Sequence, residues 1–390
     1  MSVTYPQGFL ASGVAAGLKS TGKPDVALVV NTGPRDDAAA VFTSNRVYAA
    51  PVAYSRQSMA DGHTRAVVLN SGGANACTGR GGYDDVLTTA DVVARAVDVE
   101  PSQVAVCSTG LIGVRLPMDK LLPGVHDAAD ALAADGGDAA AHAIMTTDSV
   151  PKLASLQAYD ASGERPTWRI GGMAKGAGML APGLATMLVV LTTDAVLDAE
   201  QLDASLKAAT RVTFDRVDSN GCMSTNDTVI LMASGASEQV PDPEEFAAAL
   251  TEVCRDLAEQ LIADAEGASH DIAVRVVGAA SEDDALEVAR SIARNNLFKA
   301  AVFGNDPNWG RVLAAIGTTS AAFDPNALDV SFNGVMVSRG GGIGDDRSLC
   351  DLTPRQTKVL VDLHAGAHEA TILTNDLTYD YVKENAEYSS

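Results

Sequence analysis

Short runs of aliphatic and β-branched residues recur along the chain, and turn-forming residues separate them. Such runs predict buried strands. In the first half they cover residues 25–32, 38–45, 65–71 and 103–110, the first two flanking a turn at 33–36. Later runs cover residues 186–193, 228–233 and 270–278, and alternating strands follow a turn-rich segment at 301–311 and continue to Asn375.

Segments with apolar residues at helical spacing lie between these strands. The longest covers residues 244–266 and places several aliphatic side chains on one face. Residues 83–97, 198–209 and 281–294 are also predicted helices, the last with Ser281 as N-cap. An Ala-rich helical segment at 119–143 is interrupted around Pro123 and around Gly136. A length of 390 residues suggests two or three domains or lobes.

Composition and charge exclude several classes of protein. The formal net charge of -22 argues against nucleic acid and anionic membrane surfaces as partners. The five cysteines are scattered, without zinc-site spacing, which favours a reducing compartment. We expect no signal peptide and no membrane-spanning helix, because the N-terminus lacks a basic segment followed by an apolar core and no apolar run is long enough. A cytoplasmic location follows as an expectation.

Residues 171–194 bring a candidate nucleophile next to a Gly-rich stretch. The stretch carries one cation, Lys175, and ends at Ala185-Thr186, where the apolar run begins. A threonine hydroxyl becomes a nucleophile when a base takes its proton, and a free α-amine on the same residue can be that base. Thr186 gains that amine only if the bond after Ala185 is cut. The alternative interpretation is a β-branched residue that starts a strand.

Three other polar segments have both a functional and an ordinary interpretation. The strand at 103–110 ends in Thr109-Gly110, where a hydroxyl and backbone N–H groups could face an oxyanion. Thr146 lies in a polar turn after a helix, and Glu266 is an acidic residue where the helix dipole disfavours one. By themselves, an ordinary turn, a helix terminus and a surface acid are the preferred explanations of these three.

The wider central stretch resembles a known family. Residues 175–188 match Lys-Gly-x-Gly-Met-x-x-Pro-x-x-Ala-Thr-Met-Leu without a gap, a pattern of the ornithine acetyltransferase family of arginine biosynthesis, also called bifunctional glutamate N-acetyltransferases. The resemblance continues through both halves of the chain. It implies self-cleavage between Ala185 and Thr186, giving an α chain of residues 1–185 and a β chain of residues 186–390 that begins with the nucleophile.

The resemblance also implies roles for matched residues. Thr109 and Gly110 form the oxyanion hole of the family, and six positions contact substrate: Thr146, Lys175, Thr186, Glu266, Asn385 and Ser390. One segment departs from the family. Members usually have Asp-Gly-Ser-Cys-Ser-Thr-Asn-Asp where this chain has Asn-Gly-Cys-Met-Ser-Thr-Asn-Asp at 220–227, so no role is assigned to Cys222 or Met223.

The implied reaction is ping-pong acetyl transfer. The Thr186 hydroxyl attacks the acetyl carbonyl of N-acetylornithine, ornithine leaves, and glutamate takes the acetyl group from acetyl-Thr186. The implied fold is an α/β, multi-layer αββα sandwich of the self-cleaving N-terminal-threonine type with a smaller C-terminal lobe, assembled as an α2β2 heterotetramer. The resemblance implies neither metal nor prosthetic group, and leaves open whether acetyl-CoA is also an acetyl donor.

Two alternatives to this function remain at the level of sequence. An N-terminal-nucleophile aminopeptidase or amidohydrolase would share the threonine chemistry but pass the acyl group to water. An uncleaved small-molecule binding protein would use Thr186 only as a strand residue. The first alternative needs no glutamate, and the second predicts one intact chain.

Overall fold

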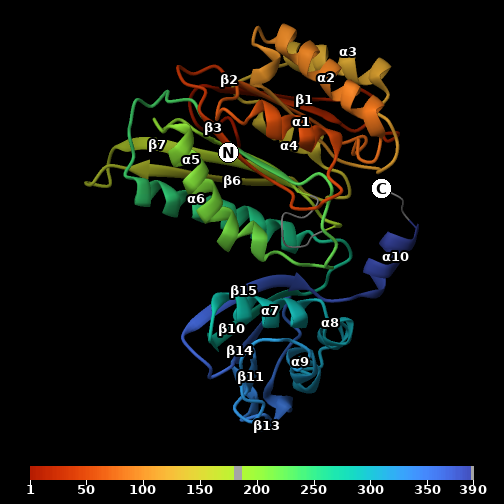
Figure 1. The fold of residues 1–390 in the computed structure, drawn as a ribbon, viewed down its shortest axis with the longest axis vertical. Helices are drawn as coiled ribbons and strands as arrows, with labels where there is room; N and C mark the ends of the chain where they lie inside the picture. Colours follow the sequence, from red (N-terminus) through yellow and green to blue (C-terminus); the bar gives the residue numbers. More distant parts are fainter. Residues whose placement is uncertain (180–186, 388–390) are drawn as a thin grey trace.

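The computed structural model describes residues 1–179 and 187–387, which form two lobes of unequal size (Figure 1). The larger lobe contains two stacked sheets with helices on their outer faces, and the smaller lobe contains a third sheet. None of the helices within these two ranges has the length and apolar composition needed to cross a membrane.

The first sheet of the larger lobe is buried on both faces. Its strand order is β1-β2-β4-β5, with β1 at Phe9–Val14, β2 at Val26–Asn31, β4 at Ala66–Asn70 and β5 at Val104–Ser108. Leu28, Val68 and Val106 pack with the outer helices, while their neighbours Val29 and Leu69 face the second sheet. Burial of alternate residues on opposite faces explains why these strands are continuous apolar runs. The outer helices are α1 (Ala50–Ser58), α2 (Gly79–Ala96) and α3 (Met118–Asp130).

The second sheet completes the sandwich. Its strand order is β3-β9-β8-β7-β6, with bounds Ala38–Phe42, Thr228–Ala233, Leu188–Thr193, Pro166–Lys175 and Lys152–Tyr159. Helices α5 (Ala199–Val212) and α6 (Pro243–Ala263) pack on its outer face, and α4 (Gly137–Ile144) packs on β1 and β2. Helix, sheet, sheet and helix layers confirm the predicted αββα sandwich.

The smaller lobe has its own hydrophobic core. Its sheet order is β13-β12-β11-β14-β10-β15, with bounds Gly342–Ile343, Val335–Arg339, Asp329–Phe332, Gln356–Asp362, Asp271–Ala279 and His368–Asn375. Its helices are α7 (Glu282–Ala293), α8 (Asn296–Phe303) and α9 (Trp309–Ile316), and a short 3-10 turn lies at Arg347–Leu349. Two further 3-10 turns, at Pro101–Gln103 and Phe214–Arg216, precede β5 and follow α5 of the larger lobe. The chain then returns toward the larger lobe as α10 (Tyr379–Glu387) (Figure 1).

The structure corrects several details expected from the sequence. Residues 171–175 of the Gly-rich stretch form the end of strand β7, and the segment at 301–311 contains the end of α8, a turn and the start of α9. Helix α3 continues through Pro123 instead of breaking there, because Leu121 and Val125 are anchored in the core. Helix α6 ends at Ala263, so Glu266 lies in the turn beyond it.

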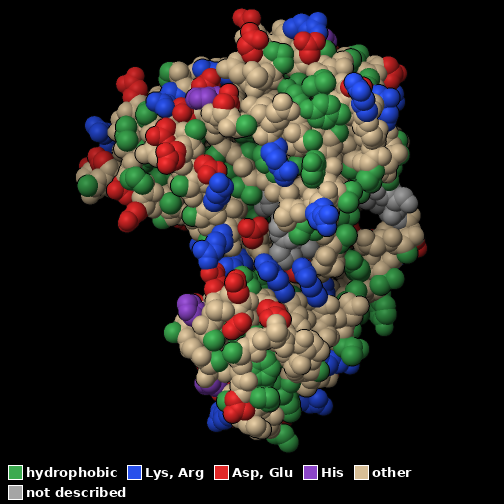
Figure 2. Space-filling model, viewed as in Figure 1, with side chains coloured by type: hydrophobic (Ala, Val, Ile, Leu, Met, Phe, Trp, Pro, Cys, Tyr) green, Lys and Arg blue, Asp and Glu red, His purple; other side chains and the backbone are tan. Residues whose placement is uncertain are grey.

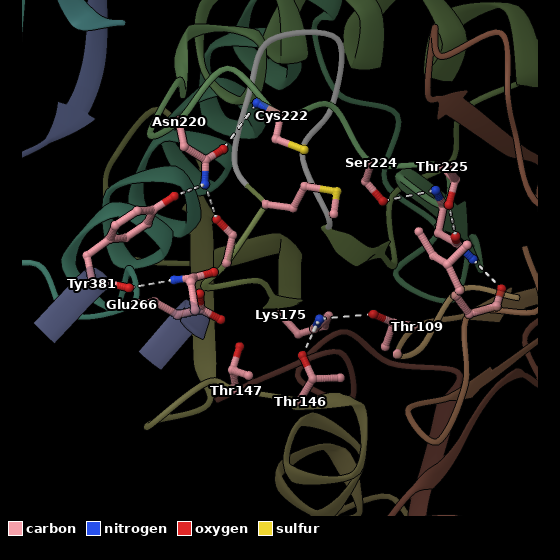
Figure 3. Close-up of a pocket in the computed structure, with 17 residues that line it drawn as sticks. Thr109, Thr146, Thr147, Lys175, Asn220, Cys222, Ser224, Thr225, Glu266 and Tyr381 are labelled. Carbon is pink, nitrogen blue, oxygen red and sulfur yellow. Dashed lines mark hydrogen bonds between the residues drawn. The ribbon is translucent and has the colours of Figure 1, made fainter. Parts of the chain in front are cut away.

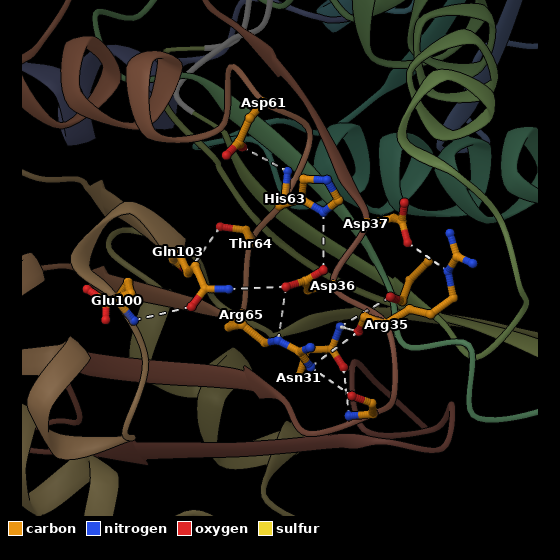
Figure 4. A network of polar contacts seen from close by, with 12 residues as sticks. Asn31, Arg35, Asp36, Asp37, Asp61, His63, Thr64, Arg65, Glu100 and Gln103 are labelled. Atoms are coloured by element: carbon orange, nitrogen blue, oxygen red, sulfur yellow. Dashed lines mark hydrogen bonds and ion pairs between the residues drawn. The ribbon is translucent and has the colours of Figure 1, made fainter.

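The link between the two sheets is fixed by a polar network (Figure 4). Asp36 lies between β2 and β3, and its carboxylate is 3.2 Å from Arg65 Nε and 3.1 Å from His63 Nδ1. Gln103 Nε2 donates to the same carboxylate over 3.1 Å. These contacts hold the chain where it leaves the first sheet for the second, so β2 and β3 lie in different sheets although a short turn joins them.

Candidate active site

A cavity of about 240 Å³ lies where the larger lobe meets α10 (Figure 3). It brings together six residues that the sequence analysis placed in the site: Thr109, Gly110, Thr146, Lys175, Glu266 and Asn385. They come from the end of β5, the turn after α4, the end of β7, the turn after α6, and α10. The other predicted residues, Ala185, Thr186 and Ser390, lie outside the described residues, and the roles of all nine stay predictions.

Lys175 lines this cavity. Its side chain is buried, and Nζ donates hydrogen bonds to Thr146 Oγ1 over 2.7 Å and to Thr109 Oγ1 over 3.1 Å. Burial lowers the pKa of Lys175, and the nearby Asp148 carboxylate opposes that change. An ammonium has three N–H donors. With two directed at hydroxyls, Lys175 has one donor left for a ligand in the cavity.

The buried Asp148 carboxylate lies near Lys175 and stabilises its positive charge. Asp148 accepts hydrogen bonds from Gly176 N over 2.7 Å, Thr146 N over 2.9 Å and Lys152 Nζ over 2.5 Å. Burial acts to raise the pKa of Asp148, but Lys175, Lys152 and these hydrogen bonds outweigh it and hold the pKa at about 2. Lys152 also pairs with Asp264. The alternating charges keep Asp148 ionised and fix both backbone segments that carry the site.

The Thr109-Gly110 turn meets a backbone requirement that only glycine satisfies without strain. Gly110 has φ +128°, and a Cβ there would lie 2.8 Å from Gly73 N. Thr109 is held in place because its N–H donates to Asn70 O and its carbonyl accepts from Gly73 N–H. The Gly110 N–H has no acceptor among the described residues. A fixed, unpaired N–H at a cavity wall is suited to stabilise a developing oxyanion.

Glu266 supplies the negative charge on the side of the cavity near α10 (Figure 3). Its N–H donates to Ala177 O over 3.1 Å, which fixes the turn after α6 against the residue beyond β7. A Cβ at Gly178 would lie 2.7 Å from Glu266 Oε1, so the glycine permits this close approach. The cavity therefore presents an ammonium and a carboxylate from different walls. That charge pattern matches a ligand with both a carboxylate and an amine.

Comparison with known proteins decides the family. A family model described as "ArgJ family" matches residues 10–390. This chain belongs to the ArgJ family.

Two members of this family match the chain over the full length of both sequences. The proteins named "Arginine biosynthesis bifunctional protein ArgJ" from Streptomyces avermitilis and Thermobifida fusca are 64% and 62% identical to this chain, with 100% of each chain covered. A crystal structure of ornithine acetyltransferase from Mycobacterium tuberculosis, complexed with ornithine, aligns at 55% identity with a TM-score of 0.44. That alignment covers 46% of this chain and 94% of the solved one.

Several residues of this ArgJ family cavity were not singled out by the sequence analysis. Asn220 Nδ2 donates to Gly178 O over 2.7 Å and lies 3.5 Å from the Tyr381 hydroxyl. Asn226 Nδ2 donates to Ala74 O and to Ser108 O, so the Ser-Thr-Asn-Asp segment contacts the strand end that precedes the Thr109-Gly110 turn. The many polar residues at 211–227 were a sequence signal for Asn220 and Asn226. Tyr381 had none, because only the tertiary return of α10 brings it to the cavity.

The altered segment of this family member reaches the cavity at Cys222. Cys222 lines the wall, while Met223 accepts a weak hydrogen bond from Ser44 outside it. Burial raises the pKa of the Cys222 thiol, and the nearby Asp227 adds to the effect. A thiol with a raised pKa is a poor nucleophile at neutral pH. Among the described residues, no group of three His, Cys, Asp or Glu side chains is arranged to hold a metal.

Proposed function

We propose that this chain cleaves itself between Ala185 and Thr186 and then transfers an acetyl group from N2-acetyl-L-ornithine to L-glutamate. Membership of the ArgJ family and relatives named for arginine biosynthesis support the proposal. The observation that carries it is the single cavity that joins Lys175, Glu266 and the Thr109-Gly110 turn, with Lys175 paired in the sheet to Leu188, the first residue of β8. The transfer requires a residue that carries the acetyl group, which is Thr186 in this proposal, and a hydrogen-bond donor to the oxyanion. It also requires one positive and one negative group to bind the charged substrate.

In the proposed reaction Thr186 forms an acetyl ester. Its hydroxyl attacks the acetyl carbonyl while its own α-amine takes the hydroxyl proton, and the Gly110 N–H together with Thr109 stabilises the oxyanion. Collapse releases ornithine, whose α-nitrogen receives the proton. The amine of glutamate then attacks acetyl-Thr186 by the reverse steps. Both half-reactions use the same groups, which explains why one small cavity suffices.

The charges of the cavity account for substrate orientation in this proposal. The free N–H of Lys175 holds the substrate α-carboxylate, and Glu266 pairs with the side-chain ammonium of ornithine. Thr146 helps to place Lys175 through the hydrogen bond described above. Asn385 and Ser390 are the proposed contacts from the C-terminal segment. Glutamate lacks the side-chain ammonium, so it binds the same cavity without the Glu266 ion pair.

The proposed cut separates two strands of one sheet. Strand β7 ends at Lys175 and β8 begins at Leu188, and the two pair in antiparallel register from Lys175↔Leu188 to Ile170↔Thr193. Chains 1–185 and 186–390 would therefore stay joined by a full strand ladder after cleavage. We propose that two such pairs form an α2β2 assembly. The proposed chemistry uses neither metal nor prosthetic group.

Mass measurement under denaturing conditions tests the cleavage. We expect two fragments that meet at Ala185/Thr186 for the unaltered protein and for Thr88→Ala, which changes an exposed threonine of α2. Thr186→Ala should stay intact. One full-length species in every sample would contradict the proposal and favour the uncleaved binding protein.

The acetyl transfer is tested with labelled N-acetylornithine. Labelled N-acetylglutamate should appear only when glutamate is present, and Thr186→Ala should form none. Release of free acetate without glutamate would instead identify an amidohydrolase. Replacing N-acetylornithine with acetyl-CoA in the same assay decides whether this chain also uses that donor.

A further inference from the structure

A second cavity, of about 610 Å³, adjoins the cavity described above, and no step of the proposed reaction uses it. The two cavities share Gly110 and Thr146 as lining residues. Lys19 and Lys23 line the second cavity, whereas Glu266 lines the first. The two cavities thus present opposite charges on either side of a shared wall.

Lys19 is held at the wall of the second cavity by its own hydrogen bonds. Its Nζ donates to Pro24 O over 2.8 Å and to Met145 O over 2.6 Å. An ammonium has three N–H donors, and the third donor of Lys19 has no acceptor among the described residues. Lys19 therefore repeats the arrangement of Lys175, in which two donors bind the protein and one is left for a ligand.

The acids near Lys19 already have hydrogen-bond donors. Asp25 accepts hydrogen bonds from three nearby backbone N–H groups. Asp148, which lines the second cavity, has both oxygens engaged as described above. Lys23 adds a second positive charge to the lining, and His142 is its remaining ionisable residue. An anion that enters this cavity therefore meets positive charge and a free donor rather than an unpaired carboxylate.

The spacing of the two lysines suits a dicarboxylate. Lys19 Nζ is 2.6 Å from Met145 O, and Lys175 Nζ is 2.7 Å from Oγ1 of the next residue, Thr146. Standard bond lengths then keep the two ammonium nitrogens within about 11 Å of each other. An extended glutamate whose carboxylates each accept a hydrogen bond of about 2.8 Å spans up to about 12 Å between the donor nitrogens. One glutamate can therefore bind both lysines.

We propose that the second cavity binds the side-chain carboxylate of the acetyl acceptor through the free N–H of Lys19. This inference rests on the proposed function, and it explains how one site takes two substrates whose side chains carry opposite charges. The α-carboxylate of either substrate binds Lys175. The side-chain ammonium of ornithine then points to Glu266, whereas the side-chain carboxylate of glutamate points to Lys19, because a second carboxylate beside Glu266 would be repelled.

The variant Lys19→Met tests the proposal. In ping-pong kinetics, kcat/KM for each substrate reports only its own half-reaction. We expect kcat/KM for glutamate to fall about tenfold, the effect of one charged hydrogen bond, and kcat/KM for N-acetylornithine to stay within about twofold. A purely structural role, in which Lys19 only holds Met145 next to Thr146, would lower both values together, because Thr146 and Lys175 serve both half-reactions.

Lys120→Met is the matched control. Lys120 Nζ also donates to a backbone carbonyl near Lys19, Gly17 O over 3.0 Å, but Lys120 is not among the described residues that line the second cavity. This variant should leave both kcat/KM values unchanged. If the unaltered protein transfers no acetyl group, the proposed function fails. If it does, and Lys19→Met lowers neither value or lowers both equally, only the inference about Lys19 fails.

The charge of Lys19 gives a second readout. Burial lowers the pKa of Lys19 to about 8, with Lys175 and Lys23 acting in the same direction and Asp25 and Asp148 against it. The positive charge is therefore lost as the pH rises through about 8. The ratio of kcat/KM for glutamate between the unaltered protein and Lys19→Met should be about 10 near pH 7 and close to 1 near pH 10. A ratio that stays constant over this range would contradict a contact through the Lys19 ammonium.

A crystal structure of the unaltered protein with saturating L-glutamate avoids any effect of a substitution. The side-chain carboxylate should lie about 2.7–3.2 Å from Lys19 Nζ. A side-chain carboxylate beyond about 4 Å from Lys19 Nζ, or one beside Glu266, would overturn the inference. Acetyl transfer by the same protein would leave the proposed function intact in that case.

Discussion

Lys175 shows how single residues shape this cavity. A buried ammonium is costly unless it is paired and hydrogen-bonded. Here the cost is offset by two threonine hydroxyls and by the nearby Asp148 carboxylate, which two backbone N–H groups and Lys152 hold in place. Lys175 therefore points in one fixed direction. The same contacts that offset the cost of burial also fix the position of this positive charge at the cavity wall.

Replacing Lys175 with Met tests this role. The thioether side chain keeps most of the volume but removes hydrogen bonds from a charged donor, each worth about 1.5–3 kcal/mol. We expect kcat/KM for N-acetylornithine to fall by about 10- to 100-fold. Lys207→Met, at an exposed lysine paired with Asp203, is the control and should leave kcat/KM unchanged. Equal kinetics for the two variants would contradict the role of Lys175.

The sequence predicted individual site residues best where a continuous motif carried them. Thr109, Lys175 and Glu266 lie in local patterns, and the structure brings them to one cavity. Asn220 and Tyr381 could not be assigned in this way. Their hydrogen-bonding distance of 3.5 Å joins residues that are 161 positions apart, and no local pattern encodes such a contact.

At the scale of elements, β7 depends on the absence of side chains. A Cβ at Gly171 would lie 2.1 Å from Ser2 O, so the N-terminal segment packs directly on the strand backbone. A Cβ at Gly172 would meet Leu191 and Leu257 at 2.9 and 3.0 Å on the opposite face. These two glycines of the Gly-rich stretch thus allow close packing on both faces of a strand.

The substitution Gly171→Ala should therefore destabilise the protein. Backbone atoms of Ser2 cannot move aside as a flexible side chain could, and overpacking of this kind costs about 1–3 kcal/mol. Gly304→Ala is the matched control, because its nearest contact would be at 3.5 Å. Urea denaturation should show a lower midpoint for the first variant and little change for the second. A midpoint for Gly171→Ala equal to that of the control would show that the N-terminal segment moves to accommodate the added methyl group.

Elements were predictable where burial made their pattern simple. The strand at 228–233 begins and ends where the sequence indicated, because every residue in it is buried. The sheet to which β2 and β3 each belong was not predictable in the same way. A short turn between two apolar strands suggests neighbours, but here the partner strands β4 and β9 come from later in the chain. Helix α3 passes Pro123 for a related reason, since core packing outweighs local propensity.

The whole molecule carries a net charge of -22. Acidic side chains are spread over both lobes in the view of Figure 2, whereas Lys and Arg side chains gather near the hollow between the lobes. A large net charge destabilises a compact state through self-repulsion, and salt screens that repulsion. The charge pattern thus makes the stability of the protein depend on ionic strength.

Thermal unfolding tests this dependence. Raising the NaCl concentration from about 20 mM to about 500 mM at pH 7.5 should raise Tm by a few degrees. Near the sequence pI of about 4.5 the net charge vanishes, so the same salt step should change Tm much less. Equal salt effects at the two pH values would show that net repulsion does not limit stability.

Helix α10 gives the cavity its last wall through Tyr381 and Asn385, and it is also the last described element to be synthesised. Folding during translation proceeds from the N-terminus, so the stacked sheets can form while α10 is still within the ribosome. A nascent chain at that stage has its hydrophobic cores but an open, incomplete pocket. The cavity therefore gains its last wall only after α10 has left the ribosome and packed against the larger lobe.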